Sequence, residues 1–245
     1  MAYVIGDIHR NFGLLGEMIN DLDIRNEAIF QVGDFGVGFD PESERRALSW
    51  LDSLLSGRGC VMHVIRGNHD DPSWFAGDNR LGNLRLEPDY TVVESGGLRY
   101  LLCGGATSID RAYLRDRMLT AEVMGARDPC YWESERFSHR PHMLEGVGRV
   151  DVVVTHTAPE WCHPDATLGF GQFVKRFFES DPRLEHDLRT ERMAVSSFFR
   201  QLEESGAGTR AHFYGHFHES RVTVRSGVTH RLLGIGECAR VEDFL

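Results

Sequence analysis

The sequence lacks an excess of positive charge. It carries 27 lysines and arginines against 37 aspartates and glutamates, which gives a net charge of −10 at pH 7. A protein that grips nucleic-acid phosphates through its surface needs a basic face, so no stable nucleic-acid binding is expected. A nucleotide substrate is still allowed, because bound divalent cations would reverse the sign of the charge locally.

Cysteine is scarce and is not arranged in pairs. The five cysteines are odd in number and form no C-x-x-C motif. This argues against a disulfide framework or a structural zinc site and favours the reduced thiols of a cytoplasmic protein.

Long apolar runs are missing as well. No stretch approaches the roughly 20 residues that a membrane span needs. A strand-like run follows Met1 at once, so no signal peptide is expected. We therefore expect a soluble protein of the cytoplasm, or of the host cytoplasm if a phage encodes it.

The first 70 residues alternate between short apolar runs and segments with helical periodicity. Strand–helix–strand order of this kind indicates parallel pairing in a buried sheet. The predicted strands are Ala2–Gly6, Ala28–Val32 and Cys60–Ile65, and the predicted helices cover Leu14–Leu22 and the residues from Pro41 to Gly57.

The rest of the chain is less regular. Two stretches, near 110–145 and 158–190, are polar and weakly periodic, and their length is typical of functional loops. We expect a single domain over 1–245 in which these two stretches form a cap or inserts. The other predicted elements are a hairpin of Tyr90–Glu94 with Leu98–Cys103, a strand at Val150–Val154, a helix at Met193–Leu202 and a closing hairpin of Val222–Val224 with Leu232–Ile235.

Potential metal ligands follow the predicted strands. The carboxyl ends of parallel strands converge on one edge of a sheet, and a glycine before most of these clusters lets the backbone turn sharply. Alternation along extended chain would place the two polar residues of the first cluster on one side, and the two histidines of the last cluster likewise. The clusters are Asp7-Ile8-His9, Gly33-Asp34, Gly67-Asn68-His69-Asp70, Thr155-His156 and Gly215-His216-Phe217-His218.

The donor atoms in these clusters are carboxylate, imidazole and amide groups, with no thiolate. Such a set suits a divalent ion such as manganese, iron, cobalt, nickel or zinc. Of these, manganese is the predicted metal.

The ordered set G-D-x-H, G-D, G-N-H-D, H and G-H-x-H, from residue 6 to residue 218, resembles the calcineurin-like metallophosphoesterase superfamily. Its style is nearest to that of bacterial and phage-type phosphodiesterases. The resemblance implies an α/β fold, a four-layered α/β/β/α sandwich with a dinuclear metal site at the carboxyl ends of the strands.

The resemblance also implies a role for each cluster. The first ion would be bound by Asp7, His9 and His218, the second by Asn68, His156 and His216, and Asp34 would bridge both.

His69 would lie beside the metals and act as a catalytic group, stabilising phosphoryl oxygens or protonating the leaving oxygen. Asp70 is placed to orient His69, but an aspartate before Asp71-Pro72 is equally good turn chemistry. Arg10 and His163 are candidate substrate contacts.

Two divalent ions roughly 3.5–4 Å apart can hold a phosphoryl group and activate a water between them. The sequence therefore predicts a metal-dependent phosphoester hydrolase that works by attack of a metal-bridging hydroxide, with no covalent phospho-enzyme.

The favoured substrate is a small nucleotide-like phosphodiester, cyclic nucleotides among them. Protein phosphatases and related hydrolases usually carry G-D-x-x-D-R-G at the second cluster and G-N-H-E at the third. Here the second cluster continues as Phe35-Gly36-Val37-Gly38 and the third ends in Asp70, although Arg66 echoes that group. A phosphomonoesterase or protein phosphatase remains the alternative, and a non-catalytic protein-binding scaffold is a third. The sequence does not determine the oligomeric state.

The assigned role of His69 makes a testable prediction. The substitution His69→Ala should leave both metal ions bound and reduce mainly the chemical step, by about 10²–10⁴-fold, because an acid and not a ligand is lost. Metal analysis beside single-turnover kinetics measures both quantities. Loss of an ion from this variant would contradict the role.

Overall fold

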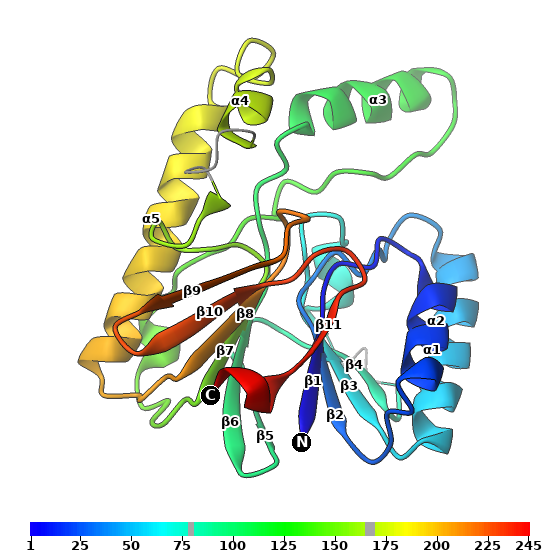
Figure 1. The fold of residues 1–245 in the computed structure, drawn as a ribbon. Coiled ribbons are helices and arrows are strands. Elements are labelled where there is room, and N and C mark those ends of the chain that lie inside the picture. Colours follow the sequence, from blue (N-terminus) through cyan, green and yellow to red (C-terminus); the bar gives the residue numbers. More distant parts are fainter. Residues whose placement is uncertain (78–80, 165–169) are drawn as a thin grey trace.

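Two β-sheets pack face to face, and helices cover their outer faces (Figure 1). The computed structural model describes residues 1–77, 81–164 and 170–245. The layers follow the order helix, sheet, sheet, helix, so the predicted four-layered α/β/β/α sandwich is confirmed.

The first sheet has the strand order β11-β1-β2-β3-β4. Strands β1 to β4 run parallel, as their strand–helix–strand sequence predicted, and β11 is antiparallel to β1. Helices α1 (Phe12–Asp21) and α2 (Pro41–Gly57) cover the outer face of this sheet. The strands are β1 (Ala2–Ile5), β2 (Ala28–Gln31), β3 (Val61–Val64), β4 (Leu84–Leu86) and β11 (Cys238–Arg240).

The second sheet has the order β5-β6-β7-β8-β10-β9. Its four inner strands are parallel, and each edge strand is the outer arm of a hairpin. The first predicted hairpin is confirmed, but the closing hairpin turns at 226–227, so most of Leu232–Ile235 lies beyond it. The strands are β5 (Thr91–Ser95), β6 (Leu98–Cys103), β7 (Val152–Thr155), β8 (Ala211–Tyr214), β9 (Arg221–Arg225) and β10 (Val228–Leu232).

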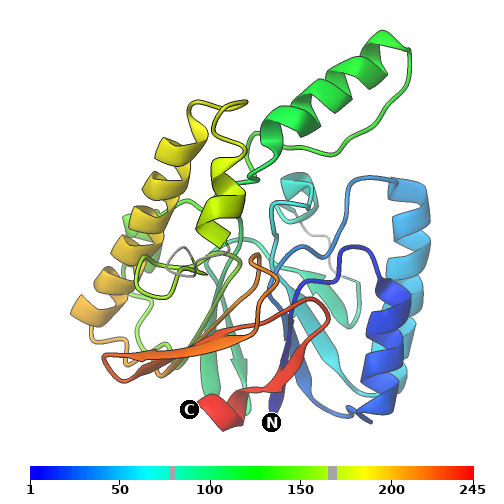
Figure 2. The same cartoon turned by 45° about the horizontal axis from the view of Figure 1, so that its top comes forward.

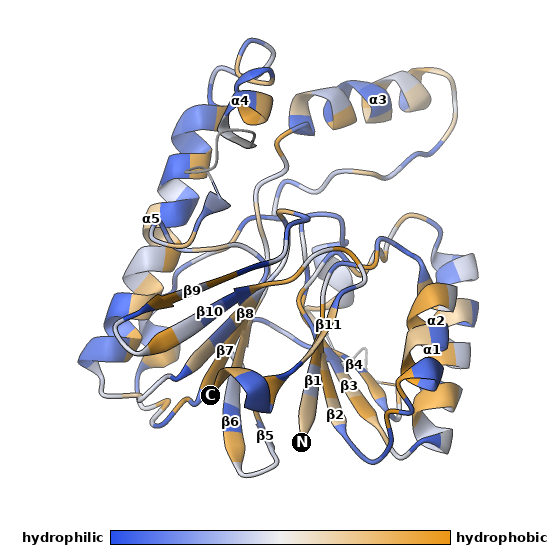
Figure 3. Ribbon diagram, in the orientation of Figure 1, coloured by the Kyte–Doolittle hydropathy of each residue, from blue (hydrophilic) through white to orange (hydrophobic). Residues whose placement is uncertain are grey.

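The central core lies between the two sheets. Val4 and Phe30 of the first sheet pack against Leu102, Val154 and Phe213 of the second, and all five are fully buried. The inner strands other than β10 are mainly apolar, since they are covered on both faces, whereas β10 reads Val-Thr-His-Arg-Leu; the helices keep hydrophilic outer faces (Figure 3).

Both stretches that were predicted to be irregular contain helices. They are α3 (Arg111–Val123) in the first and, in the second, α4 (Phe170–Lys175) and the start of α5 (Leu184–Glu204); residues 165–169 lie outside the described residues. Short 3₁₀ turns occur at Pro72–Trp74, Pro141–Leu144 and Val241–Phe244.

The helical periodicity of these stretches is weak for a physical reason. Helix α3 projects from the body of the protein (Figure 2), so Tyr113, Leu119 and Val123 are exposed and the helix has no apolar stripe to detect. The first turns of α5 bury Asp187 and Glu191, which read as surface residues in a sequence.

All five cysteines are free thiols. Among the helices that the structure describes, none is both long and apolar enough to cross a membrane.

The start of α2 depends on a buried glutamate. Asp40 caps the helix by accepting a hydrogen bond from the Ser43 amide. The Glu44 carboxylate reaches back and accepts hydrogen bonds from the amides of Gly38, Phe39 and Asp40, at 2.7, 3.1 and 2.9 Å. Glu44 therefore ties the loop that follows Asp34 to the helix.

Replacing Glu44 should destabilise the protein. Glu44→Ala leaves three amides without their acceptor, and we expect a loss of about 2–4 kcal/mol in the free energy of unfolding. The matched control is Glu42→Ala in the same helix turn, where an exposed pair with Arg46 contributes at most about 0.5 kcal/mol. Urea unfolding measures both, and equal losses would contradict this role for Glu44.

Candidate metal centre

The polar clusters after β1, β2, β3, β7 and β8 meet at one edge of the sandwich, as the sequence predicted. They do not do so by strand alternation. His9, Asp34, His216 and His218 have φ values of 45°, 52°, 71° and 55°, in the left-handed region that is unusual for residues other than glycine. The backbone therefore turns at the ligand positions, and the expectation of extended chain there is wrong.

Two glycines allow the clusters to approach one another. A side chain at Gly67 would collide with the backbone and carboxylate of Asp34. A side chain at Gly215 would collide with the carboxylate of Asp7. Any larger residue at these positions would push the loops apart, which is the physical reason for glycine in both motifs.

The first donor group contains Asp7, His9, Asp34 and His218. The Nε2 atoms of His9 and His218 lie 3.0 Å apart, and His218 Nε2 lies 3.4 Å from Asp7 Oδ2. Asp34 Oδ2 is 3.9 Å from His9 Nε2. Asp7 is held in place by the His216 amide, which donates to its carboxylate at 3.0 Å.

The second donor group contains Asp34, His156 and His216, and Asn68 lies beside it. His156 Nε2 is 3.2 Å from Asp34 Oδ1 and 3.1 Å from Asn68 Oδ1. Neighbouring ligands of an ion with bonds of about 2.1 Å are separated by about 3 Å, so these spacings fit a shared divalent ion. The donors are oxygen and imidazole nitrogen only, which suits the metals expected from the sequence.

The ring orientation of His156 is set by the backbone. Its Nδ1 lies 2.7 Å from the carbonyl oxygen of Val32 and donates to it, because a carbonyl can only accept. Nε2 therefore faces the donor group. A hydrogen bond of this kind, behind the ligating nitrogen, is what fixes metal-binding histidines elsewhere.

Charge is concentrated in this site. Burial raises the pKa of Asp7 to about 8. Burial opposes ionisation of Asp34 too, but His156 and His69 hold the pKa of Asp34 well below its usual range. Burial also opposes a charge on His156, yet Asp34 and Asp7 raise the pKa of His156 to about 9. Protons thus balance the carboxylates when no cation is present, and a divalent ion would displace them.

Burial favours the neutral form of the remaining histidines in the two groups. Burial lowers the pKa of His9 to about 4 and lowers the pKa values of His216 and His218 below the usual range. Neutral imidazole is the form that binds metal ions.

His69 lies at the rim of the site. Its amide donates to Asp34 Oδ1 at 2.8 Å, and its ring centroid is 5.6 Å from that of His9. The structure therefore places the ring next to His9 of the first donor group, without including it in either group.

Asp70 occupies a different position from the one expected. Its carboxylate accepts hydrogen bonds from the amides of Phe35, Gly36, Val37 and Gly67, at 2.6 to 3.2 Å. These bonds fasten the Asp34 loop to the loop after β3. The Asp70 carboxylate therefore holds the loops that carry Asp34 and Asn68, in place of the expected role of orienting the His69 ring.

The two candidate substrate contacts differ in exposure. The Arg10 side chain is 44% exposed next to His9, and its guanidinium lies 5.1 Å above the Phe39 ring. His163 is only 8% exposed and packs against Phe217 at a centroid distance of 4.6 Å. Arg10 is accessible to a substrate, whereas the burial of His163 argues for packing.

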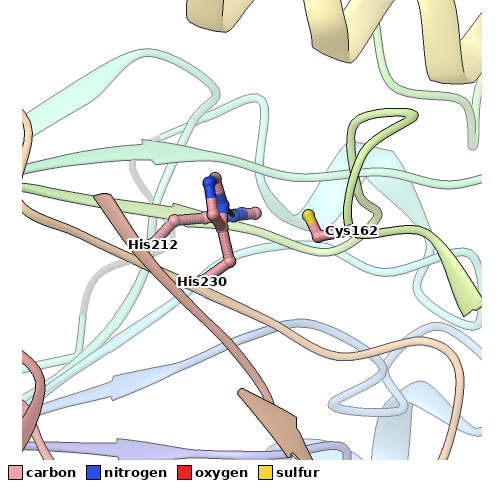
Figure 4. A group of neighbouring side chains, drawn as sticks. All are labelled: Cys162, His212 and His230. Carbon is pink, nitrogen blue, oxygen red and sulfur yellow. Dashed lines mark hydrogen bonds between the residues drawn. The ribbon is translucent and has the colours of Figure 1, made fainter. Parts of the chain in front are cut away.

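A third group with metal-binding side chains contains Cys162, His212 and His230 (Figure 4). The Trp161 indole donates to His230 Nε2 at 3.2 Å, so the proton of neutral His230 is on Nδ1 and is donated to His212 Nδ1 at 2.9 Å. His212 Nε2 then donates to the Thr155 hydroxyl at 2.8 Å. Every ring-nitrogen lone pair is engaged, so the group is a chain of hydrogen bonds that holds the end of β7.

Sequence reasoning missed two polar residues behind the second donor group. Ser108 lies 3.0 Å from Asn68 Nδ2, and Glu135 accepts hydrogen bonds from Ser108. Both are buried. Their only sequence signal is the Gly-Gly pair at 104–105 after β6, which marks a close approach of the backbone but names no partner.

A four-layered sandwich with divalent-metal donors at its strand ends is the architecture of a metal-dependent phosphoester hydrolase. A family model described as calcineurin-like phosphoesterase matches residues 2–220. The chain belongs to this family.

The chain is similar to curated proteins named UDP-2,3-diacylglucosamine hydrolase. The protein from Neisseria meningitidis serogroup A is 32% identical over 133 residues, which is 48% of this chain and 54% of that protein. The protein from Neisseria gonorrhoeae is 34% identical over 100 residues, or 38% and 40% of the two chains. The chain thus spans about half the length of the curated relatives it matches.

Solved structures with a similar fold include phosphopantetheinyl hydrolase from Mycobacterium tuberculosis. It has 17% identity and a TM-score of 0.47, with 96% of this chain and 89% of that chain covered. An archaeal phosphodiesterase has 12% identity and a TM-score of 0.40, with 100% and 95% covered.

The shared carboxylate makes a prediction about metal content. Asp34→Ala removes an oxygen from each donor group, so we expect bound Mn²⁺ to fall from about two ions per chain to well under one. Elemental analysis after dialysis measures this, with Glu17→Ala on the exposed face of α1 as the control. Wild-type metal content in the Asp34 variant would show that the two groups do not share this residue.

Proposed function

We propose that this chain is a phosphodiesterase for small nucleotide-like substrates. Its dinuclear centre would be held by Asp34 as the bridge together with Asp7, His9 and His218 on one ion and Asn68, His156 and His216 on the other. Manganese is the metal we propose, with iron, zinc, nickel or cobalt as the other ions that these donors suit.

The observation that carries this proposal is the position of Asp34. Its two carboxylate oxygens face different donor groups, at 3.9 Å from His9 Nε2 and 3.2 Å from His156 Nε2. A carboxylate in that position can bind two ions at once, and two-ion sites are the recurring solution for phosphoester hydrolysis.

The bound ions would supply positive charge that stabilises the negative phosphoryl oxygens, and they would lower the pKa of a bound water. The protein's own groups do the rest. The ring of His69 lies beside the donor groups and would donate a proton to the leaving oxygen. Arg10 is next to His9 and would hold a further negative group of the substrate, and its stacking on Phe39 keeps the guanidinium in place.

A phosphomonoesterase has less support. The sequence feature in its favour was Arg66, but this side chain is 7% exposed and is engaged by other residues of the protein. Its guanidinium donates to the backbone oxygens of Glu135 and Arg136 and to Asp89, at 2.6, 3.0 and 2.8 Å. A non-catalytic scaffold has least support, because every donor in the two groups is present.

The names of the curated relatives support a nucleotide-like substrate. They refer to a hydrolase for a UDP-linked compound. A substrate of that class carries a diphosphate, and the exposed Arg10 would bind the phosphate group that the two ions do not hold.

A comparison of two chromogenic substrates tests the proposal. We expect the Mn²⁺-loaded protein to hydrolyse bis-p-nitrophenyl phosphate at least about 10-fold faster, in kcat/KM, than p-nitrophenyl phosphate. Both substrates release p-nitrophenolate, but the diester carries one negative charge where the monoester carries two, so it repels an attacking hydroxide less. A panel of UDP-sugars and 2′,3′- and 3′,5′-cyclic nucleotides then identifies the natural class. Preference for the monoester would favour the phosphatase alternative, and no turnover with both ions bound would favour the scaffold.

A further inference from the structure

A chain of three buried polar side chains lies behind the second donor group. Asn68 Nδ2 donates to the Ser108 hydroxyl oxygen at 3.0 Å. The Ser108 hydroxyl donates to Glu135 Oε2 at 2.7 Å, and the Ser108 amide donates to Glu135 Oε1 at 2.8 Å. Ser108 is 1% exposed and Glu135 is fully buried, so water does not compete for these bonds.

The direction of donation along this hydrogen-bonded chain of side chains follows from the number of hydrogens that each group can donate. An ionised carboxylate can only accept, and the Ser108 hydroxyl has one hydrogen, which it gives to Glu135. The Ser108 oxygen must then accept from Asn68. An amide has an NH₂ end and an oxygen end, so with its NH₂ on Ser108 the Asn68 oxygen faces His156 Nε2, at 3.1 Å.

We propose that Ser108 and Glu135 are positioning residues that present the oxygen of Asn68 to the second metal ion. The proposal rests on the proposed function, since it takes Asn68 as a ligand. Only the oxygen end of an amide binds a cation, because its NH₂ group has no available lone pair. A flipped amide would remove one ligand without changing the shape of the site.

Hydrogen bonds to its backbone carbonyl fix Glu135 relative to the loop that carries Asn68. The Glu135 carbonyl accepts hydrogen bonds from the Ala106 amide at 3.1 Å and from the Arg66 guanidinium at 2.6 Å. Arg66 precedes Asn68 by two residues, so one side chain couples the loop after β3 to the segment that returns from α3. Ser108, Glu135 and Asn68 are thereby fixed relative to one another.

Glu135→Gln keeps the size of the side chain but reverses the direction in which the hydrogen bonds between Asn68, Ser108 and residue 135 are donated. The Ser108 amide still donates, so the new side chain must turn its oxygen toward that amide. Its NH₂ then donates to the Ser108 hydroxyl oxygen, which sends the hydroxyl hydrogen to Asn68. The Asn68 amide flips, and its NH₂ faces the second ion.

The readout is metal binding without substrate. Mn²⁺ is titrated at about pH 8.5, because burial raises the pKa of Glu135 to about 8 and the carboxylate form is required. We expect Glu135→Gln to weaken binding of one ion by about 10- to 100-fold. The electron paramagnetic resonance spectrum should change from that of a coupled Mn²⁺ pair to the six-line signal of a single ion. Ser108→Ala should weaken the same ion.

Thr107→Val is the matched control. Thr107 is the neighbouring residue and is fully buried, and the substitution removes the hydrogen bond that its hydroxyl donates to Glu191, at 2.7 Å, whereas the Asn68 amide donates to Ser108. Its second ion should bind as in the wild type. Thermal unfolding of all variants separates a loss of fold from a loss of ligand.

A rescue variant tests the direction itself. Asn68→Asp has an oxygen at either end, so adding it to Glu135→Gln should restore the coupled pair. A coupled pair of wild-type affinity in Glu135→Gln alone would overturn the proposal, and so would a failure of the rescue in a folded protein. These outcomes are independent of turnover, so a wild type that binds two ions but hydrolyses no phosphoester contradicts the proposed function and leaves this test intact.

Discussion

The Asp34 carboxylate lies buried between two groups of imidazoles, and each of its oxygens faces a different group. Burying a carboxylate is costly unless charge and hydrogen bonds compensate for it. The His69 amide donates to one oxygen at 2.8 Å, and His156 lies 3.2 Å from the same oxygen. The rest of the strand-end edge is arranged so that this one group can stay ionised inside the protein.

The backbone around Asp34 is strained, and the scaffold carries the strain. Asp34, His9, His216 and His218 all have positive φ, a conformation that costs about 1 kcal/mol or more for each such residue. Each follows a strand that is buried on both faces between the sheets and their helices. The tightly packed core holds the strand ends in place, so the turns at the site persist even though they are locally unfavourable.

Buried acids outside the two donor groups hold loops together. Asp70 accepts four backbone hydrogen bonds, and Glu44 accepts three. Glu135 and Glu191 bind hydroxyl groups of the loop after β6. An ionised carboxylate suits this work because it accepts several hydrogen bonds and donates none. In the proposed centre these acids hold the loops that carry the metal ligands, and they do not bind the ions themselves.

The four layers were implied by the resemblance of the ordered motifs to a known superfamily. The sequence by itself determined the parallel strands of the first sheet and the polar clusters that follow the strands. These are local: each depends on periodicity within a segment and on the residue that comes next. It also suggested that glycine would be needed beside the ligands, and the collisions expected at Gly67 and Gly215 agree. The sequence did not predict helix α3 or the first turns of α5, because α3 projects into solvent and the first turns of α5 bury acidic residues instead of an apolar stripe.

Only the tertiary structure decided what each polar residue contacts. Asp70 and Asp34 have the same chemistry and both lie near strand ends, yet one accepts backbone amides and the other faces two groups of histidines. His212 and His156 are equally buried, but the indole of Trp161 fixes the first in a chain of hydrogen bonds. A side chain's role is set by partners that are distant in sequence, and the folded sheets alone bring those partners within hydrogen-bond distance.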